Sequence, residues 1–443
     1  MKKSYYMLIV AMVTTSLLSG CLDNGSTADP PTAITATAGD GRVMLTWTGS
    51  PGVDYWLFTA TDSSLTAFNW TGLPNAHAYI KAAKPFYMCG LFNNSTYYFA
   101  MNGRKDGGPG GQSSPTINAT PYNASSNWNP GSTGSAQNLY GVGYTGLSTC
   151  SNNATSATGS FAAVGAGGAI FTSSDGKAWV DHTLASPIPS DLYAVTGYSA
   201  TQNSAGNQAH WVAVGAGGVS INSIDGGTTW TVGNTPSLTT QPLHSITQAG
   251  GTFVAVGDGG TILSTTDGNT WTTRTSGWTN NLRGVTHGTK YIAVGDGGIV
   301  LTSADGSTWT PQTYATTNIL REVAAYGGII VAVGDSGTIV TSKDSGTSWT
   351  AQTLGAMNLV GVAAESQYVY GATADPQLGY VSTAQFMAID DAGKAYTSVN
   401  GITWSAAINT GIAANPGNLG KPLVSSGFGY VVVGNAGATA YAF

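Results

Sequence analysis

Short stretches in which apolar and polar residues alternate recur along most of the chain, and turns rich in Gly, Asp and Asn separate them. The segment from Val43 to Trp47 is an early example, with valine, leucine and tryptophan at every second position. Alternation bounded by turn residues is typical of antiparallel β-strands that bury one face. The pattern therefore predicts an all-β protein.

From Leu139 onward the strands repeat as a larger unit. Each unit begins with an L-x-x-V or L-x-x-I strand, continues with two hydrophobic strands joined by a Gly-rich or Asp-rich turn, and ends in a second turn before a tryptophan. The later part of the unit spans residues 161–179, 211–230, 253–271, 291–309, 330–349 and 386–404. The first strands begin at Leu139, Leu192, Leu243, Leu282, Leu320 and Leu359. Four strands per unit predict the blades of a β-propeller.

A seventh unit, residues 420–443, offers only three strands and stops where its last turn and tryptophan should follow. A blade left short would expose an unpaired edge. The segment around Trp128 resembles the missing tryptophan strand, so we expect it to complete the ring as a seven-bladed propeller over residues 123–443. The tryptophans expected to pack between blades are Trp128, Trp179, Trp230, Trp271, Trp309, Trp349 and Trp404.

A carboxylate or amide side chain occupies the same place in the turn before six of these tryptophans. Such a side chain can accept backbone N–H bonds across a hairpin while a following glycine adopts positive φ. These residues are Asp175, Asp225, Asp267, Asp305, Asp344 and Asn400. The turns lack the spaced acidic ligands and closing Glu of a calcium loop, so we expect them to be structural.

Residues 31–122 carry a different set of strands. The segment from Leu91 to Met101 resembles the fibronectin type III signature, with Leu91, Tyr97, Phe99 and Met101 at inward positions. The resemblance implies a β-sandwich in which Tyr97 is the corner tyrosine. There is no Arg-Gly-Asp sequence, and we interpret this domain as a spacer because the sandwich fold says little about function.

The first residues indicate the compartment. Lys2 and Lys3 precede an apolar run that ends in Leu18-Ser19-Gly20-Cys21, which is a secretory signal with a lipobox-like end. We therefore predict a bacterial lipoprotein with a signal peptide over residues 1–20, lipid on Cys21 and a polar tether over residues 21–30. Leu22 after the cysteine resembles outer-membrane sorting, so we expect a cell-envelope protein, periplasmic or surface-exposed.

Charge and cysteine content narrow the functional classes. Removal of residues 1–20 takes away two lysines, so the formal charge changes from −6 to −8. An acidic chain is poorly suited to general nucleic-acid binding. Cys89 and Cys150 could form a disulfide in an oxidising compartment, or one could be buried and the other an exposed thiol. Their spacing does not decide between these alternatives.

The repeats with their Asp turns resemble photosystem II assembly/stability factor-like propellers, a subset of the Asp-box (BNR-like) propellers that also include sialidases. The resemblance covers most of residues 123–443 and implies a non-catalytic propeller that binds a protein partner as an assembly or stability factor. The same blades occur in enzymes and in binding proteins. A carbohydrate-binding surface protein and a sialidase-like glycoside hydrolase therefore remain alternatives.

The residues available do not favour catalysis. Sialidase-like hydrolysis resembles a mechanism that uses an arginine triad, a Tyr–Glu pair and an acid/base Asp, and glycoside hydrolysis generally needs a placed pair of carboxylates. The chain has only two Glu, Glu322 and Glu365, and Arg274 is expected on an outer strand, away from the other propeller arginines. The His residues show no metal-ligand spacing, and isolated surface histidines are expected. We predict no enzyme activity, no metal and no cofactor.

Alignment of the blades brings one position of every innermost strand into register around the propeller axis. This axial ring consists of Tyr140, Tyr193, His244, Arg283, Arg321, Val360 and Lys421. In one interpretation these side chains merely meet solvent or nearby Asp turns. In the other, the cations and tyrosines form a concave site for an acidic peptide, a carboxylate or a sulfated sugar. The partner is thus an unidentified protein or acidic peptide, with polysaccharide as the alternative.

The lipobox predicts that Cys21→Ala abolishes membrane partitioning and leaves the fold intact, because the anchor is a lipid attached ahead of a tether. The measurement is the fraction of protein that sediments with membranes after a salt wash, with circular dichroism as the control for folding. A variant that still sediments would contradict the lipobox assignment.

Overall fold

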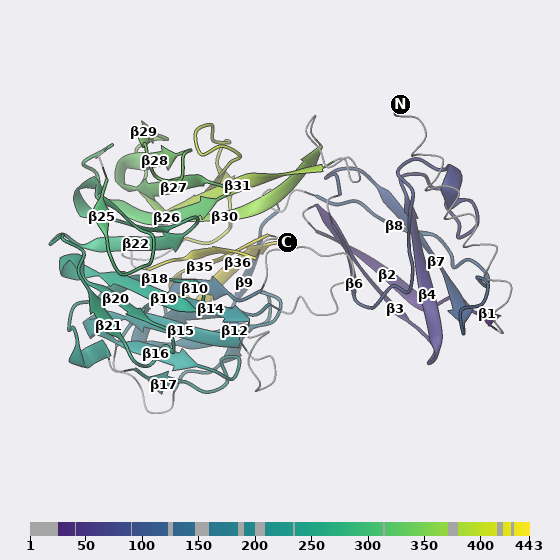
Figure 1. Cartoon of the computed structure of the whole chain (residues 1–443), viewed down its shortest axis with the longest axis horizontal. Helices are drawn as coiled ribbons and strands as arrows, with labels where there is room; N and C mark the ends of the chain where they lie inside the picture. Colours follow the sequence, from purple (N-terminus) through teal and green to yellow (C-terminus); the bar gives the residue numbers. More distant parts are fainter. Residues whose placement is uncertain are drawn as a thin grey trace. The chain divides into compact units, whose positions relative to one another are not determined.

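The computed structural model describes residues 25–39, 41–89, 91–122, 127–146, 159–184, 190–199, 209–233, 235–312, 315–370, 380–413, 420–426 and 429–443. The predicted lipid attachment at Cys21 and the predicted partner cysteine Cys150 lie outside these residues. The chain divides into two compact units, Met1–Asn123 with Cys150–Ser156, and Ala124–Thr149 with Ala157–Phe443 (Figure 1). Within the described parts, no helix is long and apolar enough to span a membrane.

The first unit consists of two antiparallel sheets. Its elements are β1 (Ser26–Ala28), β2 (Thr32–Gly39), β3 (Arg42–Thr48), β4 (Val53–Ala60), the short 3-10 turn η1 (Trp70–Gly72), β5 (His77–Tyr79), β6 (Phe86–Cys89), β7 (Tyr97–Lys105) and β8 (Ile117–Ala119). One sheet has the order β2-β3-β6, and the other has the order β1-β7-β4-β5 with β8 also paired to β7.

A single apolar core joins these two sheets. Alternate residues of β3, β4, β6 and β7 point into it, as the alternation from Val43 to Trp47 predicts. Leu91, Tyr97, Phe99 and Met101 are all buried there. The Phe92 N–H donates a hydrogen bond of 3.0 Å to the Tyr97 hydroxyl, which is the kind of contact that a corner tyrosine makes. The fibronectin type III assignment itself stays a prediction.

The predicted tether, residues 21–30, is wrong for its last part. Residues Ser26–Ala28 form β1 and pair with β7, with Thr27 opposite Arg104. The side chains of β1 are mostly exposed, so the strand joins the sheet through backbone hydrogen bonds and not through apolar burial. Amino-acid composition indicates only whether a segment can bury apolar side chains. It therefore gives no sign of an edge strand that is held by backbone hydrogen bonds.

The second unit contains seven four-stranded antiparallel sheets among its described residues. The first three are β10 (Leu139–Tyr144), β11 (Phe161–Gly165), β12 (Ile170–Ser173) and β13 (Val180–Asp181); β14 (Leu192–Ser199), β15 (Ala209–Gly215), β16 (Ser220–Ser223) and β17 (Thr231–Val232); and β18 (Leu243–Ala249), β19 (Thr252–Gly257), β20 (Ile262–Thr265) and β21 (Thr272–Arg274). The next two are β22 (Leu282–His287), β23 (Tyr291–Gly295), β24 (Val300–Ser303) and β25 (Thr310–Pro311); and β26 (Leu320–Tyr326), β27 (Ile329–Gly334), β28 (Thr338–Ser342) and β29 (Thr350–Thr353). The last two are β30 (Leu359–Tyr370), β31 (Tyr380–Asp390), β32 (Lys394–Ser398) and β33 (Ile408–Asn409); and β34 (Leu423–Ser425), β35 (Tyr430–Val433), β36 (Ala438–Ala442) and β9 (Asn129–Ser132).

Short 3-10 turns accompany the strands. They are η3 (Ala166–Gly168), η4 (Ala216–Gly218), η5 (Thr235–Ser237), η6 (Asp258–Gly260), η7 (Asp296–Gly298), η8 (Asp335–Gly337) and η9 (Asn435–Gly437). All except η5 join the second strand of a sheet to its third. In these turns the middle residue has a positive φ, for example 63° at Gly259.

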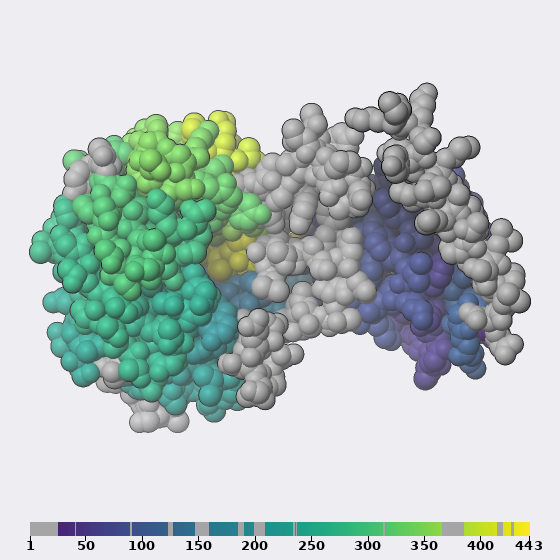
Figure 2. Space-filling model, in the orientation of Figure 1, coloured from purple at the N-terminus to yellow at the C-terminus, as the bar shows by residue number. Residues whose placement is uncertain are grey.

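The sheets close into a ring as the blades of a β-propeller. The innermost strand of each sheet packs on that of the next, from β10 through β14, β18, β22, β26 and β30 to β34, and β34 packs on β10. The last sheet is completed by β9, in which Asn129 lies opposite Tyr441 and Ser132 opposite Ala438. The predicted pairing of the Trp128 segment with residues 420–443 is thus confirmed. Figure 2 shows the blades from teal to green as one packed surface.

Apolar packing between neighbouring blades holds the ring. Seven clusters of buried side chains each combine residues of two successive sheets. Trp271, for example, packs with Val212 of the preceding blade and Phe253 of its own. Each of the seven predicted tryptophans lies in or against one such cluster. Burial of one large side chain stabilises a fold by about 1.5–3 kcal/mol, so the seams between blades carry much of the stability.

The turns before the tryptophans are held by a side-chain network. Asp305 Oδ1 accepts the backbone N–H groups of Ser307 and Thr308, and the Ser303 hydroxyl donates to the same carboxylate at 3.0 Å. That hydroxyl also accepts the N–H of Gly306. A Ser or Thr stands at this place in all six turns, at Ser173, Ser223, Thr265, Ser303, Ser342 and Ser398. The hydroxyl two residues before the Asp or Asn is thus part of the motif.

Ring closure predicts that deletion of residues 127–132 destabilises the propeller, because it removes β9 and the Trp128 indole. Loss of a packed tryptophan costs about 3 kcal/mol or more, which corresponds to a drop in Tm of several degrees. Thermal unfolding of the full chain and of the deletion variant is the measurement. A synthetic peptide of residues 123–135 should restore Tm, whereas a scrambled peptide should not. An unchanged Tm in the deletion variant would show that β9 does not close the ring.

Candidate functional site at the axial ring

Six of the seven axial-ring residues are the extra residue of a β-bulge in an innermost strand. The register between first and second strands shifts at this point in the first six blades, for instance between Leu243 and Ser245, where His244 is the unpaired residue. A bulge bends its strand and redirects the side chain. In the seventh blade Lys421 precedes β34. The structure therefore gives the sequence-aligned positions a shared local geometry.

The aromatic part of the ring is closed. The rings of Tyr140 and Tyr193 lie 5.8 Å apart, and Tyr193 stacks on His244 at the same spacing. Both tyrosines are only 8% exposed. A Cβ on Gly420 would lie 1.9 Å from the Tyr193 carbonyl oxygen, so the approach to β34 packs directly on this side. The predicted contribution of Tyr140 and Tyr193 to an open binding surface is therefore wrong.

Two of the three fixed cations of the ring are paired with aspartates. Arg283 donates two hydrogen bonds to Asp296, from Nε at 2.8 Å and from Nη2 at 3.0 Å. Arg321 Nε forms an ion pair with Asp335. In these two blades the turn after the second strand places an Asp beside the bulge of its own hairpin, so the arginines meet the nearby Asp turns, as the first interpretation in the sequence analysis holds. The guanidinium and carboxylate groups stay partly exposed, with side-chain exposures of 16–25%.

His244 belongs to the same arc but differs in charge. Its Nε2 lies 2.7 Å from Asp258 Oδ1. Burial lowers the pKa of His244 more than the nearby carboxylate raises it, so the imidazole is neutral near pH 7 and the charge of Asp258 is not cancelled. The prediction that the His residues are surface residues fails for His244 and also for His210, which is buried with Nδ1 at 3.1 Å from the Tyr198 hydroxyl.

Aspartates outnumber cations around the ring. The fixed cations are Arg283, Arg321 and Lys421, and aspartates lie in the turns and at the inner-strand starts of the blades. Those aspartates are Asp191, Asp258, Asp296, Asp335 and Asp391. Lys421 is half-buried, and among the described residues it has no ion-pair partner within 4.0 Å. By this count the ring carries more acidic than basic groups, which favours the interpretation in which the cations meet nearby Asp turns.

Glu322 is an ionisable residue next to the ring position Arg321, and the sequence analysis did not predict it there. It follows Arg321 in β26 and is fully buried. Its Oε1 accepts the N–H of Val323 at 3.0 Å, while Oε2 has no hydrogen-bond partner. Burial raises the pKa of Glu322 to about 7, and the positive charge of Lys421 opposes this rise. Only its departure from the Gly, Ala, Ser and Pro residues at the same place in the other blades could have signalled it.

Glu365 and Arg274, the other residues considered for hydrolase chemistry, are held by hydrogen bonds to neighbouring groups. Glu365 is buried, and its Oε2 accepts the Ser425 hydroxyl at 2.7 Å and the Gly429 N–H at 3.2 Å. Arg274 lies on the outer strand β21 and donates to the Ser264 hydroxyl. Within the described ranges, no group of three or more His, Cys, Asp or Glu is placed to hold a metal ion.

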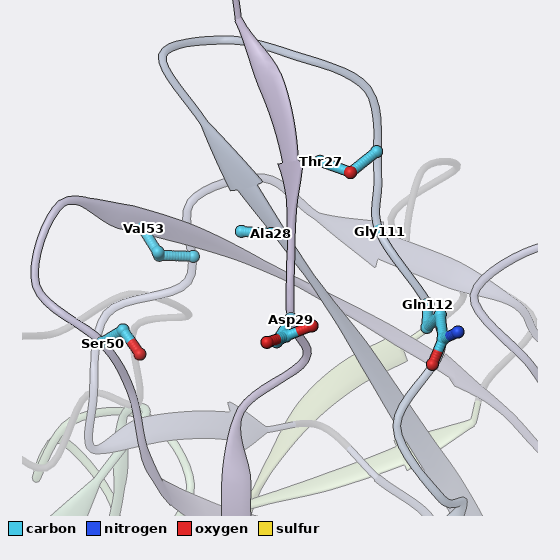
Figure 3. A pocket seen from close by; sticks show the side chains of 7 residues that line it. All are labelled: Thr27, Ala28, Asp29, Ser50, Val53, Gly111 and Gln112. Carbon is cyan, nitrogen blue, oxygen red and sulfur yellow. The ribbon is translucent and has the colours of Figure 1, made fainter.

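A cavity of about 500 Å³ lies in the first unit, away from this ring in the chain (Figure 3). Its lining residues come from β1, the start of β4 and the turns beside them: Thr27, Ala28, Asp29, Ser50, Val53, Gly111 and Gln112. Asp29 is the one ionisable group among these seven. A single carboxylate with no second ionisable group in the lining gives little basis for a reactive site, so the axial ring is the stronger candidate.

Comparison with known proteins supports the propeller fold. A model of the DUF6242 beta propeller domain matches residues 284–364. The solved structure "YCF48 bound to D1 peptide" is similar with a TM-score of 0.52 and 16% identity, over 73% of this chain and 96% of that chain. YCF48 from Cyanidioschyzon merolae is similar with a TM-score of 0.50 and 16% identity, over 71% of this chain and 98% of that chain. No curated protein sequence matches. At this identity the likeness shows the fold alone, and the fold agrees with the predicted resemblance.

The buried Glu322 predicts a pH dependence of stability. Because burial raises the pKa of Glu322 in the folded chain to about 7, above its ordinary value of 4.5, the unfolded chain loses this proton first as the pH rises. Stability from this group is present below pH 4.5 and is lost as the pH rises through 7, by up to about 3 kcal/mol at 1.36 kcal/mol per pKa unit. The measurement is the difference in unfolding free energy between wild type and Glu322→Gln from pH 4 to 9. A difference that does not change with pH would contradict the assignment.

Proposed function

We propose that the protein is a non-catalytic cell-envelope lipoprotein whose propeller binds a protein partner at the axial ring. The observation that carries this proposal is the arc of blades three to five, where Asp258, the Arg283–Asp296 pair and the Arg321–Asp335 pair lie partly exposed. A carboxylate has about four acceptor positions, and each arginine occupies only some of them. The arc therefore offers fixed donors and free acceptors side by side, which suits a polypeptide segment.

Solvent-exposed aromatic rings around a groove would favour a sugar, and a charged face with few aromatics would favour a protein. Tyr140 and Tyr193 are buried, so they are not available to stack on a pyranose. The exposed groups of the arc are charged and paired. This contrast supports a protein partner over a carbohydrate.

Hydrolase chemistry has little support from the same residues. Glycoside hydrolysis needs two carboxyl groups on either side of the scissile bond. The carboxyl of Glu322 is enclosed, and that of Glu365 is occupied by Ser425 and Gly429. The aspartates of the arc are held by Arg283 and Arg321 or face His244. We infer a binding role.

The excess of aspartates at the ring indicates the charge that a binding segment should carry. Since aspartates outnumber cations there, the segment that binds should carry Lys or Arg side chains and few acidic ones. A peptide partner is also supported by the solved propeller whose title describes YCF48 bound to a D1 peptide. That likeness concerns the fold, and the basic character of the partner rests on the aspartates of this chain.

The rest of the chain fits an anchored binding protein. We propose that lipid on Cys21 holds the protein at the outer membrane and that the first unit is a fibronectin type III-like spacer. The contact between Tyr97 and Phe92 and the two facing sheets support the sandwich assignment. In this arrangement the first unit takes no part in binding the partner at the axial ring.

The test is binding of fluorescent peptides of equal length that carry either Lys or Glu at the same positions, measured by anisotropy with the full chain. We expect the Lys peptides to bind more tightly, and Asp258→Asn with Asp391→Asn to weaken them at least fivefold, because the double variant removes two negative charges from the ring. The matched control is Asp106→Asn with Asp181→Asn, which makes the same change of net charge at exposed positions elsewhere.

Tighter binding of Glu peptides that is lost in Arg283→Ala with Arg321→Ala would overturn the proposed charge preference and restore the acidic-peptide hypothesis. Equal weakening in the ring variant and in its control would show that net charge, and not the ring, determines binding. Retained thermal stability of every variant is the check that the blades are intact.

A further inference from the structure

The cavity of the first unit is lined by the strands on both sides of β7 (Figure 3). In the sheet, β7 lies between β1 and β4, and Gly103 of β7 is opposite Ala28 on one side and Tyr55 on the other. A Cβ on Gly103 would lie 2.3 Å from the Asp29 carbonyl oxygen and 3.1 Å from Cγ1 of Val53. A side chain on β7 here would displace both walls, so glycine is required for the shape of the cavity.

Backbone contacts hold the walls of this cavity. On the side of β1, a Cβ on Gly111 would lie 1.9 Å from the Ala28 carbonyl oxygen, and the Gly111 N–H donates to the Gly103 carbonyl at 2.9 Å. On the side of β4, the Val53 N–H donates to the Ser50 carbonyl at 3.4 Å. Because backbone groups make these contacts, we expect the cavity to keep its form when one lining side chain is replaced.

The cavity contains one carboxylate among neutral polar groups. Its lining includes the hydroxyls of Thr27 and Ser50, the amide of Gln112 and the carboxylate of Asp29. Figure 3 shows the Asp29 side chain between Ser50 on one side and Gln112 on the other. Among the residues that the structure describes, Asp29 makes no ion pair within 4.0 Å. Its carboxylate is therefore available to a cation from outside the chain.

The cations of the neighbouring strand β7 do not neutralise this carboxylate. Arg104 lies opposite Thr27 of β1, and its guanidinium carbon stacks over the Trp56 ring, 3.6 Å from the ring centroid. Lys105 is exposed, and over the described part of the chain it forms no ion pair with Asp29. The cavity therefore presents a negative charge to a ligand.

The lining determines the chemistry of a ligand that fits. A carboxylate or phosphate group would meet Asp29 with a charge of the same sign. A primary ammonium group is compact and has three N–H donors, which match the carboxylate of Asp29, the hydroxyl oxygens of Thr27 and Ser50, and the amide oxygen of Gln112. Because Asp29 is exposed, its ion pair with a free amine in solution is weak. The site therefore needs a source that keeps the amine close.

We propose that this cavity binds the primary ammonium group of a lipid headgroup at the membrane that carries the protein. Ser26, the first residue of β1, follows Cys21 by five residues, and an extended chain spans at most about 3.6 Å per residue. The strand therefore begins within roughly 18 Å of the proposed lipid anchor. So short a link keeps headgroups at a high effective concentration near the cavity, which allows a weak contact to persist. The lipid source rests on the proposed anchoring, whereas the ammonium site rests on the cavity alone.

The ammonium site is tested on the full chain with ethanolamine, whose amine is protonated near neutral pH. We expect the backbone amide signals of Gly111 and Gln112 to shift saturably in NMR spectra, and Asp29→Asn to weaken this binding at least fivefold. Ethylene glycol has a hydroxyl in place of the ammonium and should cause no such shift. Asp106→Asn is the matched variant and should bind like wild type, because it removes an exposed carboxylate of the same unit outside the cavity lining.

The lipid source is tested with the lipidated full chain in nanodiscs of phosphatidylethanolamine or of phosphatidylcholine. The two headgroups have the same net charge, but the trimethylammonium group of choline has no N–H donor. We expect the Gly111 and Gln112 signals at their ethanolamine-bound positions in phosphatidylethanolamine and at their free positions in phosphatidylcholine. In Asp29→Asn the two kinds of nanodisc should give the same spectrum.

The outcomes distinguish the site, its source and the anchor. Equal binding of ethanolamine by wild type and Asp29→Asn would overturn the ammonium site, and so would equal shifts with ethylene glycol. Ethanolamine binding without a difference between the two lipids would overturn the lipid source and indicate a soluble amine as the ligand. Failure of the chain to attach to either nanodisc would count against the proposed anchor on Cys21, because the ethanolamine shifts do not depend on it.

Discussion

The close approach of successive innermost strands around one axis is the constraint on which the rest of the propeller depends. Each blade buries one face of its sheet against the preceding blade and the other against the next, so no blade has a complete core of its own. Two glycines of the innermost strand β10 show how tight this packing is. A Cβ on Gly141 would lie 2.4 Å from the carbonyl oxygen of Tyr193 in the next blade, and a Cβ on Gly143 would lie 2.5 Å from that of Val195. Since the seams support one another, the unpaired edge left by a three-stranded last blade had to be filled, and β9 fills it.

Much of this architecture could be predicted because it repeats. Six copies of one pattern identify the strands, the interblade tryptophans and the Asp turns, and the defect in the seventh copy points to the segment around Trp128. The short strand β1 could not be predicted in the same way. Its residues are polar and exposed, and its place is fixed by backbone hydrogen bonds to β7, which leave no periodic trace in the sequence.

The axial ring shows what the alignment of the repeats could not predict. The alignment identified structurally equivalent positions, but it considered each side chain without its neighbours. The repeats also indicate which turn residue accompanies each kind of ring residue. The two blades with Tyr at the ring have Ala166 and Ala216 at the turn, whereas His244, Arg283 and Arg321 occur in the three blades with Asp258, Asp296 and Asp335. A tyrosine needs no counter-charge, an arginine does, and a neutral imidazole can donate a hydrogen bond to the carboxylate. Comparison of the two positions blade by blade would have predicted the ion pairs, but the bulge that brings them together is visible only in the backbone.

The sixth blade carries this argument one step further. Asp390 stands where the other blades have glycine, and it keeps the same register, opposite Leu359. Its buried carboxylate accepts the N–H of Lys394 and the Tyr396 hydroxyl, and no 3-10 turn forms over the described residues 391–393. A side chain at this place thus replaces the 3-10 turn by a turn of the same length that is held by the hydrogen bonds of Asp390. The same blade carries Val360 at the ring position, where the three preceding blades carry His244, Arg283 and Arg321. Because its ring residue is uncharged, Asp391 in the following turn has no ring cation of its own blade to pair with, and it accepts a hydrogen bond from Asn358 Nδ2.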